Sequence, residues 1–431
     1  MNRKRILISV CLFVCLANCV YSQGLPTAKH PEDVGFSSER LDRITKLFQA
    51  DVDKGAIPGA IILVARDGKL AYFHAIGFQD REKHIPMKTD AIFRIASMTK
   101  PITSVAIMML AEEGKIDLLA PVSQYIPEFK DLKVGVEKTD PNTGNPTLSL
   151  EDVKRPMTVQ DLLRHTSGLV YGPFGNTLVH QAYQQADLFN NSQTLAEFIT
   201  KLSKLPLAHQ PGTAWEYGMS IDVLSRIVEI VSGMPFDLFV EERIAKPLAM
   251  RDTAFYLSAA QAPRLAELQV DPATGKRPGG APQDALTKEK MKWFSGGGGL
   301  LSTAPDYAQF CQMLLNKGEL NGARLLSPKT IALMDSDQLS PGIPRIGGYE
   351  DLNPSQELAQ GFGLGFAVRT QIGPNPLPGS VGDFFWAGIY GTYFWIDPQE
   401  KLFAVMMVQM PFAQSGYYRR TLREFVYSAL H

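Results

Sequence analysis

The chain has 431 residues, of which 45% are hydrophobic and 20% are charged, and its formal net charge is −1. This length is too great for one small domain, and the composition supports a substantial buried core rather than a disordered chain. The nearly balanced charge excludes a strong electrostatic attraction to nucleic acid or to an anionic membrane surface. Four cysteines are too few for a scaffold held together by disulfides.

The N-terminus has the pattern of an export signal. Basic residues 3–5 precede an apolar run over residues 6–17, which is too short to span a bilayer. The sequence therefore predicts a signal peptide over residues 1–22 and a mature protein that is exported, either periplasmic or secreted, without a transmembrane span. A lipoprotein anchored through Cys19 is the second interpretation, because Asn18 fits poorly before a lipidated cysteine.

The first predicted element is a β-hairpin over residues 59–77, in which two apolar runs flank a turn at residues 66–69. A helix is predicted over residues 101–113, because apolar residues recur every three or four positions and Gly114 suits its end. Residues 131–156 are polar and rich in turn formers, which indicates a surface excursion.

The middle of the chain predicts mainly helices. Thr158 and Asp161 have the spacing of a capping box at the start of one helix. Residues 194–206 and 219–232 also show helical periodicity, whereas residues 259–290 predict irregular structure.

Strands return toward the C-terminus. The predictions there are a helix over residues 302–317, a loop over 373–382, a hairpin over 389–397 and 401–409, and a final helix over 418–430. Cys311 lies in an apolar helical stretch and is expected in the core.

The placement of strands near both ends, with helices between them, predicts an α/β (α+β) fold with two domains. Residues 23–100 and 290–431 are expected to form the sheet domain, and residues 101–289 a mainly helical domain inserted into it. A cleft between the two is the expected place for a site.

Several catalytic motifs are absent from the sequence. It contains no Gly-x-Ser-x-Gly nucleophile elbow, no Walker A loop and no His-Glu-x-x-His pair. The sequence therefore gives no support for a metal site, and we expect no cofactor.

Ser97 and Lys100 form the only Ser-x-x-Lys pattern in the chain, and they lie at the beginning of the predicted helix that contains Pro101. A spacing of three residues brings the amine beside the hydroxyl, and burial would favour the neutral amine that can accept the serine proton. The helix N-terminus favours a developing anion. Taken alone, the pattern also fits a capped surface helix.

Two further features could complete an acyl-transfer site. Tyr217 precedes a predicted helix and could carry a proton, although a packed aromatic residue is the usual alternative. Trp386 begins a predicted strand whose small residues Ala387 and Gly388 would let a substrate lie along it, and the N–H of Ile389 could point at an acyl oxygen. A glycine-bearing strand end without function fits this segment equally well.

Together these features resemble the serine β-lactamase-related family, which includes class C β-lactamases, certain DD-peptidases and family VIII carboxylesterases. The resemblance rests on residues 93–100, 165–169, 295–300 and 390–393, in matching order across nearly the whole mature chain. It implies a mostly antiparallel sheet flanked by helices with an all-helical domain.

The resemblance also implies roles for individual residues. Ser97 would be the acylated nucleophile, Lys100 its general base, and Tyr217 a partner in proton transfer. The backbone N–H groups of Ser97 and Ile389 would form the oxyanion hole. His165 and the glycine run at residues 296–299 are expected to be structural.

Two positions depart from the β-lactamase pattern. Trp386 replaces a lysine that attracts the substrate carboxylate, and losing such a charge-assisted bond costs about 2–3 kcal/mol. Met219 replaces a common asparagine. Both changes add apolar surface, so Trp386, Ala387, Gly388 and Met219 are expected to contact a neutral substrate.

The sequence thus predicts an exported serine hydrolase, a carboxylesterase that acts on neutral short-acyl esters through an acyl-serine. A β-lactamase or DD-peptidase acting on peptidoglycan-like amides is one alternative, and a non-catalytic binding protein on the same scaffold is another. The expected partner is a small-molecule ester or amide. Transfer to an alcohol other than water, and any oligomeric state, stay open.

Overall fold

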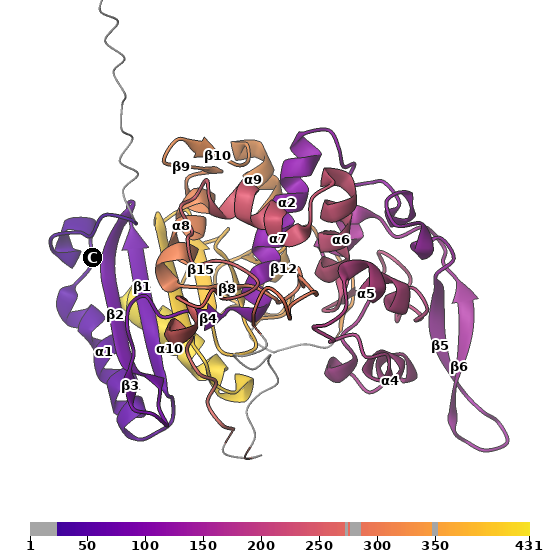
Figure 1. Cartoon of the computed structure of the whole chain (residues 1–431), viewed down its shortest axis with the longest axis horizontal. Coiled ribbons are helices and arrows are strands. Elements are labelled where there is room, and N and C mark those ends of the chain that lie inside the picture. Colours follow the sequence, from indigo (N-terminus) through magenta and orange to yellow (C-terminus); the bar gives the residue numbers. More distant parts are fainter. Residues whose placement is uncertain (1–23, 272–274, 276–285, 347–351) are drawn as a thin grey trace, which may run out of the picture.

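A computed structural model describes residues 24–271, 275, 286–346 and 352–431 (Figure 1). The predicted signal peptide and Cys19 lie outside the described residues. The main sheet consists of β1 (Gly59–Arg66), β2 (Lys69–Asp80), β3 (Ile85–Pro86), β12 (Gln360–Phe362), β13 (Ala367–Arg369), β14 (Phe384–Ala387), β15 (Tyr393–Asp397) and β16 (Leu402–Val408).

The order of strands in this sheet is β12-β13-β14-β15-β16-β1-β2-β3, and all neighbours pair antiparallel. β1 pairs with β16, so the two ends of the chain meet in the middle of the sheet. The predicted mostly antiparallel sheet is therefore confirmed.

The first hairpin matches its prediction. β1 and β2 are joined by Asp67 and Gly68, whose φ angles are 50° and 74°. Positive φ at both central residues gives a turn whose twist suits a two-residue hairpin. All residues of β1 except the last are buried, because helices cover the sheet beside this central strand.

Three helices pack on the sheet. α1 (Ser38–Asp53) contacts β2 and α10 (Phe412–Ser428), and α8 (Ala304–Leu315) contacts β1 and β16. Figure 1 shows α1 and α8 on opposite sides of the ribbon formed by β1 and β2. Cys311 on α8 is fully buried, as expected from its apolar surroundings.

The helical part is centred on α2 (Thr99–Glu112), whose residues from Thr99 to Leu110 are all buried. α2 packs against α6 (Ser220–Ser232) and α7 (Phe236–Val240), and α6 also contacts α3 (Val159–Leu163) and α5 (Leu195–Leu202). The capping box of Thr158 and Asp161 is formed at the start of α3. The remaining regular elements are α4 (Leu178–Gln185), α9 (Pro328–Met334), β4 (Phe93–Arg94), β7 (Trp215–Glu216), β8 (Leu301–Ser302), β9 (Glu319–Leu320), β10 (Ala323–Arg324) and β11 (Arg345–Ile346).

The predicted surface excursion is a regular ribbon. β5 (Lys133–Thr139) and β6 (Pro146–Asp152) pair antiparallel and protrude from the helical part (Figure 1). Most of their side chains are exposed or half-buried, so the apolar alternation that marks a strand with one buried face is missing.

The segment around Trp386 differs from its prediction. Trp386 and Ala387 end strand β14 instead of beginning a strand, and the following strand, β15, begins only at Tyr393. Residues 388–391 form a tight turn between them, in which the Gly388 N–H donates to the Thr392 carbonyl at 2.8 Å. β14 has only four residues after a glycine- and proline-rich loop, and its short apolar run carries no periodicity.

The observed helices also differ from the predicted ones at the two ends of the chain. α1 was not predicted, and α10 begins at Phe412, six residues before the expected start at 418. No helix within the described ranges is both long enough and apolar enough to cross a membrane.

Candidate active site

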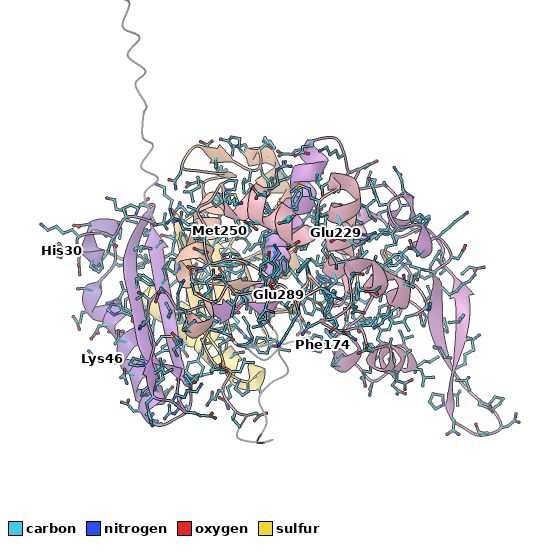
Figure 2. All side chains as sticks on the ribbon, viewed as in Figure 1. His30, Lys46, Phe174, Glu229, Met250 and Glu289 are labelled. Atoms are coloured by element: carbon cyan, nitrogen blue, oxygen red, sulfur yellow. The ribbon has the colours of Figure 1, made fainter. Side chains whose placement is uncertain are left out.

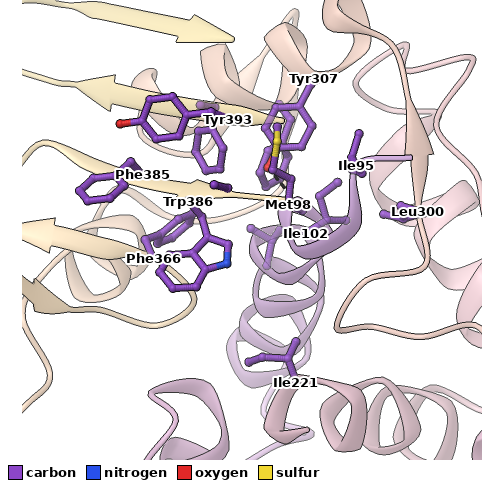
Figure 3. Packing of buried hydrophobic residues seen from close by; sticks show 14 of the residues in the cluster. Ile95, Met98, Ile102, Ile221, Leu300, Tyr307, Phe366, Phe385, Trp386 and Tyr393 are labelled. Carbon is purple, nitrogen blue, oxygen red and sulfur yellow. Dashed lines mark hydrogen bonds between the residues drawn. The ribbon is translucent and has the colours of Figure 1, made fainter. Parts of the chain in front are cut away.

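Ser97 lies in a tight 3-10 turn over residues 96–98 that leads directly into α2. The preceding Ala96 has a φ of 45°, a left-handed conformation that costs a non-glycine residue about 1–3 kcal/mol. The turn is held from outside, since the Ile95 N–H donates to the Leu300 carbonyl at 3.1 Å and the Tyr307 hydroxyl to the Met98 carbonyl at 2.9 Å. Figure 3 shows these side chains around the beginning of α2.

Lys100 lies one turn further along the chain and is 1% exposed. Its Nζ lies 3.1 Å from the Ser97 Oγ and 2.6 Å from the Gly297 carbonyl oxygen. Burial lowers the pKa of Lys100 to about 7, and the Asp222 carboxylate opposes this effect. A substantial fraction of the amine is therefore neutral near pH 7, and a neutral amine at this distance can accept the proton of the Ser97 hydroxyl.

Tyr217 closes the other side of the amine. The Lys100 Nζ lies 4.6 Å from the centre of the Tyr217 ring. The indole Nε1 of Trp386 donates to the Tyr217 hydroxyl at 3.4 Å, and the two rings are 5.3 Å apart. Trp386 thus contacts the tyrosine directly at the position where the resemblance places a lysine.

The residues around Tyr217 are fixed by His165, which is 1% exposed. Its carbonyl accepts from the Glu216 N–H at 3.1 Å, and its Nδ1 accepts from the Gly218 N–H at 3.4 Å. Burial holds the pKa of His165 well below its usual range, so the imidazole is neutral. These contacts fit the structural role expected for His165.

A cavity of about 670 Å³ opens above Ser97. Its wall includes Ser97, Ala387 and Ile389 from the predicted site. Aromatic side chains supply much of the remaining wall: Tyr171, Phe174, Phe189, Tyr217, Trp293 and Trp386. Figure 2 labels Phe174 at the edge of the helical part that faces the sheet part.

Two residues expected to contact substrate do not line this cavity. Met219 is 0% exposed and packs in the core immediately before α6. Gly388 faces the turn before Ser97, where a Cβ atom would lie 2.5 Å from the Ile95 carbonyl oxygen and 2.2 Å from the Thr392 hydroxyl. Gly388 therefore permits close packing of the strand end against the Ser97 turn.

Ile389, the second residue expected in the oxyanion hole, lines the same cavity. Ile389 lies in the turn after β14 and is 37% exposed. Within the part of the chain that the structure describes, this N–H donates to no other residue. Ser97 and Ile389 thus face one cavity from two different elements.

The sequence interpretation missed Asp222, a buried carboxylate that also lines the cavity. It accepts hydrogen bonds from the Ser295 hydroxyl, the Gly297 N–H and the Tyr171 hydroxyl. The pKa of Asp222 lies above its ordinary value, because burial outweighs the opposing effects of Lys100 and of these donors. An acidic residue among the apolar positions of the predicted helix 219–232 was the available signal.

The glycine run at residues 296–299 is a tight passage. A Cβ on Gly297 would lie 2.2 Å from the nearer Asp222 oxygen, and one on Gly296 would lie 2.8 Å from the Ser225 Cβ. The close approach lets the Gly297 carbonyl reach Lys100. Among the described residues, no group of three or more His, Cys, Asp or Glu side chains could hold a metal ion.

Comparison with known proteins gives a consistent family. The family model described as Beta-lactamase matches residues 44–427. Protein Rv1367c of Mycobacterium tuberculosis is 36% identical over 369 residues, covering 83% of this chain and 87% of that protein. Esterase EstB of Burkholderia gladioli is 29% identical, covering 92% of this chain and 96% of that protein.

Among solved structures, EstCE1, described as a hydrolase with promiscuous acyltransferase activity, superposes with a TM-score of 0.72 at 26% identity. The match covers 92% of this chain and 99% of that chain. The family match spans both the sheet part and the helical part that enclose Ser97 and Lys100. The chain therefore belongs to the beta-lactamase family and is a serine hydrolase.

Proposed function

We propose that this hydrolase is a carboxylesterase that cleaves neutral short-acyl esters through an acyl-serine on Ser97. The observation that carries the proposal is the buried Lys100 amine, 3.1 Å from the Ser97 hydroxyl at the floor of an aromatic cavity. The similarity to Esterase EstB and to the hydrolase EstCE1 supports the same activity.

In the proposed acylation, neutral Lys100 takes the Ser97 proton while the Oγ atom attacks the ester carbon. The N–H groups of Ser97 and Ile389 stabilise the negative oxygen that forms. When the bond to the leaving alcohol breaks, Tyr217 gives its proton to the alkoxide and regains one from Lys100. A water molecule then attacks the acyl carbon, its proton passes to Lys100, and Ser97 is released protonated.

The cavity supports a neutral substrate. Asp222 adds negative charge to the wall, and the indole of Trp386 stands where a lysine would attract a carboxylate. A volume of about 670 Å³ is large for a short acyl group. We therefore assign the aromatic side of the cavity to the alcohol part of the ester.

The test compares p-nitrophenyl acetate and butyrate with nitrocefin and a peptide ending in D-alanyl-D-alanine. The expected result is hydrolysis of the two esters at rates at least a hundredfold above that of nitrocefin, and loss of this activity in Ser97→Ala. Preferential cleavage of nitrocefin or of the peptide would favour the β-lactamase or DD-peptidase alternative. If the protein hydrolyses none of these substrates and forms no covalent adduct with an activated phosphonate, the non-catalytic binding-protein alternative is favoured.

Acyl transfer to an alcohol is a second candidate, because EstCE1 combines hydrolase and acyltransferase activity. The same assay with butanol added would reveal it as butyl ester formed at the expense of free acid. Equal yields of free acid with and without butanol would argue against it.

We also propose that the enzyme is exported and that residues 1–22 are removed. The basic and apolar pattern of residues 3–17 supports this. Expression in a Gram-negative host with mass measurement of the periplasmic fraction tests it. An intact N-terminus in the cytoplasm would contradict it.

A further inference from the structure

Among the described residues, Asp222 is the only carboxylate on the cavity wall, and the proposed reaction does not use it. It projects from α6 and is 1% exposed. A buried carboxylate is costly unless hydrogen bonds compensate for the lost hydration. Three donors surround it, namely a serine hydroxyl, a backbone N–H and a tyrosine hydroxyl, which is the environment of an ionised carboxylate.

These contacts connect Asp222 to Lys100 through a single residue. The Gly297 N–H donates to one Asp222 oxygen at 3.1 Å, and the carbonyl of the same Gly297 accepts from the Lys100 Nζ at 2.6 Å. The hydroxyl of Ser295, which lies two residues before Gly297, donates to the same Asp222 oxygen. The Asp222 carboxylate thus binds residues 295 and 297 and orients the Gly297 carbonyl toward the Lys100 amine.

The charge of Asp222 acts on the same amine. No direct ion pair joins the two side chains in the described structure, but Asp222 is the group that favours protonated Lys100 against burial. The other titratable groups facing the amine are Tyr171, Tyr217 and His165. His165 is neutral, and Tyr171 is held protonated because burial raises its pKa.

We propose that Asp222 is a positioning residue for the serine hydrolase reaction: it fixes the Gly297 carbonyl against the Lys100 amine, and its charge favours transfer of the Ser97 proton to that amine. The proposal rests on the proposed function, in which Lys100 is the base. It assigns the carboxylate no contact with the reacting atoms.

The test is the pH profile of kcat/KM for p-nitrophenyl butyrate in wild type, Asp222→Asn and Tyr171→Phe. An asparagine of the same size removes the charge, so neutral Lys100 should persist to lower pH and the acid limb should move down by about one pH unit. The plateau should fall about tenfold, because a less basic amine is a weaker proton acceptor. Tyr171→Phe keeps the charge and should not move the limb downward.

If Asp222→Asn folds and the acid limb of its pH profile stays at the same pH as in wild type, the proposal is overturned. If Asp222→Asn does not fold, Ser295→Ala tests this hydrogen bond: we expect kcat to fall about threefold or more with KM unchanged, together with some loss of Tm because a buried carboxylate loses a donor. A lower Tm with unchanged kcat would show that the contact is only structural. Absence of Ser97 acylation in wild type would instead reject the proposed function, so the two failures are distinguishable.

Discussion

The Lys100 side chain shows how one residue can carry both a functional and an energetic consequence. Burial lowers its pKa from the ordinary 10.5 to about 7. Between these two values the unfolded chain binds a proton that the folded chain has lost, so stability rises with pH over this window. Below about pH 7 the folded protein carries the full cost of a buried ammonium group.

Lys100→Met should therefore stabilise the protein at low pH while abolishing esterase activity. The pKa difference corresponds to on the order of 5 kcal/mol at pH 6, offset by about 1 kcal/mol for the lost hydrogen bond to Gly297. The gain should disappear by about pH 10.5. Urea unfolding of both proteins at pH 6, 8 and 10 measures this difference in the free energy of unfolding. If Lys100→Met is no more stable than wild type at pH 6, the claim that burial lowers the pKa of Lys100 is contradicted.

Trp386→Phe isolates the contact between the indole and Tyr217. Phenylalanine keeps an aromatic ring beside Tyr217 and loses the donor at 3.4 Å. Losing one hydrogen bond of about 0.5–1.5 kcal/mol predicts a kcat lower by about twofold to tenfold, with KM for a neutral ester nearly unchanged. Steady-state kinetics on p-nitrophenyl butyrate measures this, and an unchanged kcat would show that the indole does not assist the tyrosine.

At the scale of single residues, the sequence predicted the contact between catalytic residues that lie a few positions apart. The separation of three residues predicted that Ser97 and Lys100 lie together, and the structure places them at hydrogen-bond distance. The long-range contact of Trp386 with Tyr217 spans 169 positions and follows from the fold alone. Met219 was misplaced for the same reason, because spacing does not tell which side of a helix start faces the cavity.

At the scale of elements, the turn after β14 is fixed by glycine. Gly388 leaves no room for a side chain, because a Cβ would lie 2.5 Å from the Ile95 carbonyl that precedes the Ser97 turn. Gly298 lies close by in the glycine run, yet its nearest contact would be an ordinary 3.7 Å to Ala96. Gly388 and Gly298 therefore allow the same substitution to be compared at a crowded and at an uncrowded position near the Ser97 turn.

Gly388→Ala should separate the strand end from the Ser97 turn and lower the acylation rate about tenfold or more, because small misplacement of reacting groups is costly. Gly298→Ala should fold with a Tm within about 2 °C of wild type, since it meets no close atom. Stopped-flow acylation and thermal unfolding compare them. Equal acylation rates in Gly388→Ala and wild type would show that this packing does not position the oxyanion hole.

Several elements with a periodic apolar pattern or a clear capping signal were predicted, although the long helix α1 was not, and most short or polar strands were missed. The hairpin of β1 and β2 and the helices α5, α6 and α8 follow from apolar periodicity and turn residues. β14 and the ribbon of β5 and β6 lack that signal, since one is four residues long and the other is largely exposed. The division of the chain into residues 23–100 with 290–431 and residues 101–289 stays a prediction.

At the scale of the whole molecule, the cavity joins parts of the chain that are far apart in sequence. Ser97 begins α2, Tyr171 and Trp293 come from the middle of the chain, and Ala387 ends a strand of the main sheet. A group bound in the cavity should therefore stabilise the assembled fold. Composition predicted a large core, but only the tertiary structure shows which segments enclose the cavity.

Ser97 displaces p-nitrophenol from a p-nitrophenyl methylphosphonate ester, and the adduct keeps the second ester group in the place of the substrate alcohol. An adduct that keeps a benzyl ester should raise Tm by about 2 °C or more, and one that keeps a methyl ester should raise it less, because only the benzyl group reaches the aromatic wall. Thermal unfolding of each adduct measures the difference. An equal or lower Tm for the benzyl-ester adduct than for the methyl-ester adduct would mean that the alcohol part of a substrate does not occupy this wall.

The central claim is that Lys100 deprotonates Ser97, which then carries the acyl group. Intact-mass analysis with peptide mapping, after exposure of wild type and Lys100→Met to p-nitrophenyl butyrate and to an aryl phosphonate, tests it most directly. We expect one adduct on Ser97 in wild type, forming faster as pH rises through about 7, and almost none in Lys100→Met. An adduct on another residue, or equal labelling of the two proteins, would contradict the account.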